Sequence, residues 1–373
     1  LHPRVRRQRQ MCIRDRPISW NKNQYKEGTN EYVAVRPELK KQIEELYRKH
    51  PEEARDSFGE DPFEVKNILK YWVFSEKPEF HVIPTDTINI HIDKDALLRS
   101  GFMLPKTIRH LKGEDLKDAI PDKLYIPLTD IRMLTKVDLL MLEMLANCNW
   151  ERPLYLAISV GSVSKLKFDN YFVQEGLAFR FTPFDYKKWG DVGENRLYAV
   201  DVERLYNNVM NRYKYGGLDT PGLYLDETTL RTCWYHRRLF AQLAKELIAQ
   251  GDNERAKKVL AYAEQVIPGY NVPETHESGS YDIATAYAAL GEKTKAVTLA
   301  VHLIAEAEDY INWAFSLKGN RIEMVRNDCI YKFWQWNQYN ELLKKIDGEK
   351  YKESNRRFEE KYGLFAPTMN YKN

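Results

Sequence analysis

The chain has 373 residues, which is enough for two or three domains of ordinary size. Hydrophobic residues make up 43% of it and charged residues 30%, a composition typical of a folded protein rather than a disordered one. The formal net charge of +3 gives no electrostatic footprint for nucleic acid, so we expect no nucleic-acid partner. The longest apolar runs, 139–146 and 296–307, are shorter than the roughly 20 residues that a membrane-spanning helix needs.

The first sixteen residues are strongly basic, and the composition changes abruptly at Pro17. Within them, residues 11–16 resemble the translation of a transposase end sequence that is used in preparing sequencing libraries. We therefore expect residues 1–16 to be an artefact and the natural start of the chain to be missing. The alternative is a genuine disordered basic tail.

Residues 17–79 are predicted to form a helical or irregular connecting segment. The apolar spacing within 37–50 is that of an amphipathic helix, and a shorter helix is expected over 62–71.

Residues 80–225 are predicted to form an α/β domain. Alternation of apolar and polar residues at 80–83 and 87–92 predicts two strands with one buried face. A further short strand is expected over 124–128, where Pro127 favours an edge position.

The second half of this domain shows a transition from helix to strand. Thr135 can cap a helix whose first turn contains Asp138. The apolar run 154–160 has the pattern of a central strand, and 179–181 predicts another strand. An amphipathic helix is expected over 201–213.

Residues 226–347 are predicted to be wholly helical, and two segments of this region match each other. Apolar and small residues stand at the same offsets from Gly251 in one copy and from Gly291 in the other. The pattern resembles tetratricopeptide repeats, in which small residues let two helices pack closely. The predicted packing positions are Ala244, Leu247, Gly251, Ala256, Leu260, Ala263, Pro268, Ala284, Tyr287, Gly291, Ala296 and Ala300.

Two hairpins are fewer than the roughly three that normally stand by themselves, so neighbouring segments must cover their ends. We expect residues 230–240 to do so on one side, and residues 348–373 to form a C-terminal helix and tail. The bulky layer on the other side is Trp313, Phe315, Phe333, Trp334 and Trp336. The functional alternative for this layer is an aromatic groove for a peptide or a sugar.

The nearest approach to a metal site is formed by His81, His91 and Asp93, of which the last two would share a strand face. Three such residues also occur commonly on a polar solvent face. We therefore predict no metal and no cofactor.

The candidate catalytic groups are better explained by structural roles. Glu175 is expected to be a carboxylate in a loop that precedes Gly176, and Asp226 is expected to be the N-cap of a helix. Cys148 is expected to be a small core residue rather than a nucleophile. None of the common catalytic motifs is present, so we predict no catalytic residue in this chain.

Five phrases of the sequence carry a resemblance to a known family. Together they resemble the C-terminal soluble region of bacterial membrane proteins with domain of unknown function 2723, a family similar to protein O-mannosyltransferases. The resemblance covers about residues 20–313. The phrases are residues 149–157 (NWERPLYLA), 171–180 (YFVQEGLAFR), 206–210 (YNNVM), 221–227 (PGLYLDE) and 266–273 (VIPGYNVP).

This resemblance implies a domain on the periplasmic side of the inner membrane, attached to a membrane glycosyltransferase-like module that precedes this chain. The membrane would be reached only through that missing N-terminal region, and no catalytic residue is carried over. The expected fold is an α+β N-terminal part followed by an all-α tetratricopeptide-like helical-hairpin domain.

The expected function is that of a non-catalytic accessory or interaction domain that positions a protein acceptor or another protein partner. One alternative is a carbohydrate-binding module, suggested by the abundance of Tyr and Trp, with a glycan as partner. Another is an independent hydrolase that uses Glu175 with Asp226 or Glu227, which would require paired carboxylates in one cleft.

Overall fold

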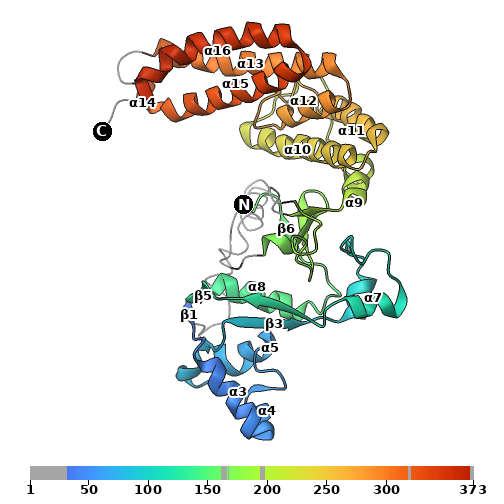
Figure 1. The fold of residues 1–373 in the computed structure, drawn as a ribbon, viewed down its shortest axis with the longest axis vertical. Helices are drawn as coiled ribbons and strands as arrows, with labels where there is room; N and C mark the ends of the chain where they lie inside the picture. The colour runs from blue at the N-terminus through green and yellow to red at the C-terminus, as the bar shows by residue number, and fades with distance from the viewer. Residues whose placement is uncertain (1–31, 161–165, 167, 194–197, 318–320, 370–373) are drawn as a thin grey trace, which may run out of the picture. The chain divides into compact units, whose positions relative to one another are not determined.

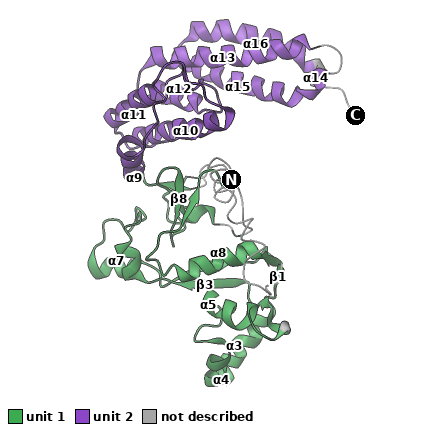
Figure 2. Ribbon diagram, turned by 180° about the vertical axis from the view of Figure 1, so that it is seen from behind, with its two compact units in different colours: residues 1–201 green, residues 202–373 purple. Residues whose placement is uncertain are grey.

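The computed structural model describes residues 32–160, 166, 168–193, 198–317 and 321–369. The expected artefact 1–16 lies outside the described residues, as does the start of the expected connecting segment. The chain divides into two compact units, residues 1–201 and 202–373 (Figure 2). Figure 1 labels their helices and strands.

Unit 1 mixes short strands and short helices. Its strands are β1 (Tyr32–Val35), β2 (Val82–Ile83), β3 (Thr87–His91), β4 (Lys123–Pro127), β5 (Met133–Thr135), β6 (Tyr155–Ala157), β7 (Phe172–Gln174), β8 (Ala178–Phe181) and β9 (Ala199–Val200). Its helices are α3 (Leu39–Lys49), α4 (Pro51–Phe58), α5 (Val65–Ile68), α6 (Lys94–Arg99), α7 (Gly113–Ala119) and α8 (Lys136–Asn147), with the π-helical turn η1 (Leu69–Val73) and the 3-10 turns η2 (Pro78–Phe80) and η3 (Asp169–Tyr171).

The strands form three small sheets. Strand β1 lies between β2, to which it is parallel, and β5, to which it is antiparallel. Strands β3 and β4 form an antiparallel pair. The third sheet has the order β6-β8-β7-β9. The predicted strands over 80–83, 87–92, 124–128 and 179–181 therefore all contain an observed strand, and Pro127 ends a strand with a single described neighbour, as its sequence favoured.

The core of unit 1 is apolar and draws on both helices and strands. Ile88 and Ile90 of β3 and Ile126 of β4 are almost fully buried, as the period of two requires for one face of a strand pair. Helix α8 begins with a capping box. The Thr135 side chain accepts a hydrogen bond from the Asp138 backbone N–H, and the Asp138 carboxylate accepts from Thr135 in return. This confirms the predicted helix start.

The prediction of a central strand at 154–160 is wrong. Only Tyr155–Ala157 is a strand, and among the described strands it pairs with β8 alone, which places it at the edge of the observed sheet. Its apolar run looked like a strand buried on both faces, yet Tyr155 is 48% exposed. The inner strands β7 and β8 are the buried ones.

Unit 2 is built from helices. They are α9 (Val202–Asn207), followed by the π-helical turn η4 (Asn208–Arg212), then α10 (Glu227–Ala249), α11 (Asn253–Val266), α12 (Ser280–Ala289), α13 (Lys293–Ser316), α14 (Arg321–Met324), α15 (Arg326–Ile346) and α16 (Gly348–Met369). An α+β part followed by an all-helical part is the fold class that the sequence predicted.

Short turns join α10 to α11, α12 to α13 and α15 to α16, and the two members of each pair pack against each other. In addition α10 packs on α12, and α13 packs on α15 (Figure 1). The two glycines of the internal match stand in the first two turns, each with a positive φ near 80°. Helix α16 makes a third helical pair with α15, which adds to the two hairpins that the sequence match revealed.

The predicted packing positions lie mostly at the contacts between these helices. Ala244, Leu247, Ala256, Leu260, Ala284, Ala296 and Ala300 are almost fully buried, and Ala263 and Tyr287 nearly so. Small side chains at these crossings let the helix backbones come close together.

Candidate functional site

Unit 2 contains a cavity of about 380 Å³ between its first and second hairpins. Four of the predicted packing residues line it: Leu260, Ala263, Pro268 and Tyr287. With Ile267 and Leu299 they give it a largely apolar floor. Its volume lies within the range of about 300–1,000 Å³ that is usual for ligand sites in proteins.

A buried arginine holds the loop beside this cavity. The guanidinium of Arg237, on α10, donates to the carbonyl oxygens of Ile267, Val272 and Pro273 at 2.6–3.0 Å and to the hydroxyl of Ser278 at 3.1 Å. Burial lowers the pKa of Arg237 to about 10, while the negative charge of Glu274 acts in the opposite direction. The side chain therefore remains a cation at pH 7, and it supplies donors that the loop carbonyls would otherwise lack.

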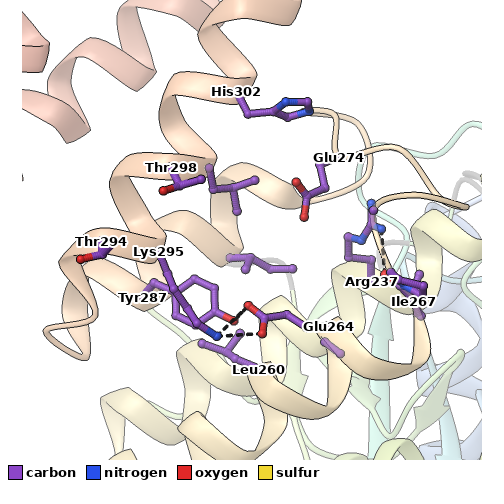
Figure 3. Close-up of a pocket in the computed structure, with 15 residues that line it drawn as sticks. Arg237, Leu260, Glu264, Ile267, Glu274, Tyr287, Thr294, Lys295, Thr298 and His302 are labelled. Carbon is purple, nitrogen blue, oxygen red and sulfur yellow. Dashed lines mark hydrogen bonds and ion pairs between the residues drawn. The ribbon is translucent and has the colours of Figure 1, made fainter. Parts of the chain in front are cut away.

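A second polar group ties the two hairpins together. The Glu264 carboxylate, on α11, accepts hydrogen bonds from the Tyr287 hydroxyl of α12 and from Lys295 Nζ of α13, the latter at 2.7 and 2.9 Å (Figure 3). Burial, followed by the bond to Glu264, raises the pKa of the Tyr287 hydroxyl above its ordinary value. These contacts close one end of the cavity with groups that already satisfy each other.

The remaining polar groups of the cavity are open. Thr298 and His302 follow Lys295 along α13, and both are exposed. The Glu274 side chain has no hydrogen bond or ion pair to any residue that the structure describes. The cavity thus offers an apolar floor, one open carboxylate and several hydroxyl or imidazole groups along a helix.

Gly279, just before α12, has a φ of 84°, and a Cβ atom there would lie 2.9 Å from Arg238 Cγ and 3.3 Å from Arg238 Cα. We expect Gly279→Ala to lower the free energy of unfolding by about 2 kcal/mol, because both strain and a clash act against it. Gly291→Ala is the matched control, since its φ is 79° and nothing lies within 4 Å of the added atom. Urea denaturation should show a larger loss in the free energy of unfolding for Gly279→Ala than for Gly291→Ala. Equal losses would mean that the contact with Arg238 does not affect stability.

The three residues considered for a metal site are not brought together, and two of them have structural partners. His81 Nε2 lies 2.6 Å from the backbone oxygen of Ser75, and Asp93 accepts the Ala96 N–H as the N-cap of α6. His91 and Asp93 do line one cavity in unit 1, but His81 does not. Within the described ranges no three His, Cys, Asp or Glu side chains are grouped to hold a metal ion.

The carboxylates considered for catalysis also have local partners. Glu175 is buried in unit 1, where it accepts a hydrogen bond from the Tyr155 hydroxyl at 2.9 Å and pairs with Arg180 at 3.6 Å. Asp226 caps α10 by accepting the backbone N–H groups of Thr228 and Thr229. Each therefore has the structural role that its sequence position indicated.

The cysteine that the sequence placed in the core lies there. Cys148 is buried and its thiol donates to the backbone oxygen of Leu145 at 3.1 Å. Burial raises the pKa of the Cys148 thiol above its ordinary value, which disfavours the reactive thiolate.

The C-terminal aromatic layer is divided between the core and the surface. Phe333 and Trp336 are buried, whereas Trp313 and Trp334 are each 49% exposed. The Trp334 ring is stacked on Tyr331 with 5.6 Å between centroids and 12° between planes. The layer therefore covers the end of the hairpins and also presents a pair of stacked rings.

The fold and the cavities define a two-part protein: a compact α+β unit followed by a unit of helical hairpins with a ligand-sized cavity between two of them. Residues 7–203 match the family TMEM260-associated domain 2, a domain of a membrane-protein family. Because this match spans more than half of the 373 residues, the chain belongs to that family. The matched region ends within two residues of the boundary between the two units.

This match confirms that the chain is related to a membrane-protein family, as the sequence predicted. The closer relationships to domain of unknown function 2723 and to tetratricopeptide repeats stay predictions. No curated protein and no solved structure matches the chain. Among the helices of the described residues, none combines the length and the apolar character needed to cross a membrane.

Proposed function

We propose that the chain is a non-catalytic accessory region of a membrane glycosyltransferase-like protein, and that its helical unit binds an extended segment of a protein partner or acceptor. The observation that carries this proposal is the cavity between the first two hairpins, which combines an apolar floor with open polar groups. In this arrangement the reaction would take place in the membrane-embedded module, on the periplasmic side of the inner membrane, and this chain would position the acceptor.

The lining of the cavity suits a peptide more than a small apolar molecule. An aliphatic side chain could pack on Leu260, Ile267 and Leu299, while a neighbouring Lys or Arg could pair with the open carboxylate of Glu274. The hydroxyl group of Thr298 and the imidazole of His302 could bind backbone groups of the same segment. We therefore expect bound peptides to place an aliphatic residue next to a basic one.

A peptide selection tests this proposal. A phage-displayed library panned on the whole chain should enrich such peptides, and Thr298→Trp should weaken their binding at least tenfold, because the exposed Thr298 lines the cavity and the larger ring would fill it. Lys258→Trp is the matched control, since Lys258 is exposed on the neighbouring helix α11 and lies outside the cavity lining. An equal loss of peptide binding in Thr298→Trp and Lys258→Trp would contradict the proposal. So would a selection that enriches no peptides.

The stacked rings of Tyr331 and Trp334 support a second candidate function, carbohydrate binding, because sugar faces pack on exposed aromatic rings. A glycan array probed with the whole chain separates the two functions. Binding of glycans that Trp334→Ala abolishes and Thr298→Trp leaves intact would favour this second function.

A further inference from the structure

Unit 1 contains a second cavity, of about 410 Å³, which none of the roles described above uses. Four stretches of chain meet around it: the segment before α5, the end of β3, the start of β4 and the end of α8. Its lining is almost wholly polar. It comprises Asp61, Glu64, Lys66, His91, Asp93, Lys123, Ala146, Asn149, Trp150 and Glu151.

One wall of this cavity has an unusual backbone. Asn149 and Trp150 have φ values of 47° and 59°, and they are the only non-glycine residues at positive φ within the described ranges. Such a conformation costs about 1–3 kcal/mol for each residue, and for a bulky side chain such as Trp it is rare. It persists here because the Trp150 indole donates to the backbone oxygen of His91 at 2.8 Å and Lys66 donates to the Asn149 side chain at 3.1 Å.

The cationic groups of the cavity already have partners. Lys123 Nζ lies 2.6 Å from the Asp61 carboxylate, and Lys66 is bound to Asn149. Burial alone would raise the pKa of Asp61, but hydrogen bonds from Lys123 and from the Phe63 backbone outweigh it and hold the pKa below its ordinary value. The ion pair therefore stays intact at neutral pH and does not compete for a ligand.

Two hydrogen-bonding groups of the lining are left open. The side chains of Glu64 and His91 make no hydrogen bond or ion pair to the residues described by the structure. A carboxylate accepts hydrogen bonds, and a neutral imidazole can donate one and accept one. Both side chains are therefore available to a ligand.

The charges decide which class of ligand fits. Asp61, Glu64, Asp93 and Glu151 outnumber Lys66 and Lys123, so an anion such as a phosphate would be repelled. Hydroxyl groups both donate and accept, so they suit a cavity that mixes free carboxylate acceptors with an imidazole. The volume also suits a small polar ligand.

We propose that this cavity binds an uncharged sugar residue, with Glu64 and His91 as its hydrogen-bonding partners and with the Asn149–Trp150 backbone forming one wall. The site lies within the region that matches the family and is independent of the peptide cavity in unit 2.

The test is saturation-transfer NMR and calorimetry on the whole chain with the methyl glycosides of mannose, glucose and galactose. At least one glycoside should bind, and Glu64→Ala should weaken it about tenfold, as loss of a hydrogen bond to a charged group implies. Glu52→Ala is the control, because Glu52 is exposed on α4 and lies outside the cavity lining. Asn149→Gly should also weaken binding while the melting temperature stays the same or rises, because glycine adopts this φ without strain.

Three results would overturn the proposal. The first is that none of the three glycosides binds. The second is binding that Trp334→Ala abolishes but Glu64→Ala leaves unchanged, which would place the sugar on the stacked rings of unit 2. The third is that inorganic phosphate binds the wild-type chain and Glu64→Ala strengthens it, which would identify an anion site. If Asn149→Gly fails to fold, the comparison of sugar binding by Glu64→Ala and Glu52→Ala still tests whether the cavity is the binding site.

Discussion

Arg237→Met is expected to lower the free energy of unfolding of the helical unit by about 3–5 kcal/mol, the cost typical of removing one partner from a buried charged network. Arg237 donates to three loop carbonyls and one hydroxyl, and three of these partners, Ile267, Val272 and Ser278, are buried. Methionine fills a similar volume but donates nothing, so the buried carbonyl oxygens of Ile267 and Val272 would lose their donor.

Urea denaturation, followed by the tryptophan fluorescence of the chain, measures this loss. Hydrogen exchange should locate it in α10, α11 and the loop between α11 and α12. Arg231→Met is the matched control on the same helix, because its side chain is 64% exposed and pairs with the exposed Glu227. A surface substitution of this kind should change the free energy by no more than about 0.5 kcal/mol. A similar small effect for Arg237→Met would show that the loop does not depend on it.

Arg180→Met is the corresponding prediction for the α+β unit. Arg180, on β8, donates to the backbone oxygens of Ser100 and Gly101 at 2.9 and 3.0 Å and pairs with Glu175, and both charged side chains are less than a tenth exposed. Its removal would take the Arg180 cation away from the buried Glu175 carboxylate. We expect a loss of about 3–5 kcal/mol in the free energy of unfolding.

The double variant Glu175→Gln with Arg180→Met should be more stable than Arg180→Met alone, because the buried charge that Arg180 balanced is then removed as well. Arg48→Met, on the exposed surface of α3, serves as the control. If Glu175→Gln gave no recovery in the Arg180→Met background, the pair would not be coupled. Retained stability together with a lost enzymatic activity in Glu175→Gln would instead revive the hydrolase hypothesis.

The parts of the fold that the sequence predicted depend on local signals. The capping box at Thr135 and Asp138, the alternation over 87–92 and the two glycine turns at Gly251 and Gly291 are each encoded within a few residues. The sequence also predicted that the ends of the two hairpins must be covered and that a helix follows residue 347, because hairpins with one apolar face must be packed against something. It did not predict that α15 and α16 form a third helical pair.

The parts that were wrong or missed depend on distant partners. Whether Tyr155–Ala157 is an inner or an edge strand is decided by β7 and β9, which lie up to about 45 residues further along the chain and are only two or three residues long. Periodicity within one segment does not contain this information. The same holds for β1, whose neighbours β2 and β5 come from separate parts of the chain.

The candidate sites were predicted only in part. The sequence identified Leu260, Ala263, Pro268 and Tyr287 as packing residues, but not that they surround a cavity with Glu274 and His302. One signal in the sequence could have pointed to this part of the helical unit. Arg237 stands four residues after Cys233 and seven before Ala244, and both of these residues are buried. A charged side chain therefore interrupts an apolar helix face. A cation at such a position must find partners inside the fold, and here they are the carbonyls of the loop.

Hydrogen exchange of the whole chain, with and without a peptide selected on it, tests the central claim most directly. If the helical unit binds a protein segment in the cavity between its first two hairpins, the bound peptide should slow exchange in residues 264–274 and along the Lys295 to His302 stretch of α13. The protection should disappear in Thr298→Trp and persist in Lys258→Trp. Protection confined to α15 around Trp334, or to unit 1, would contradict the account and place the binding surface elsewhere.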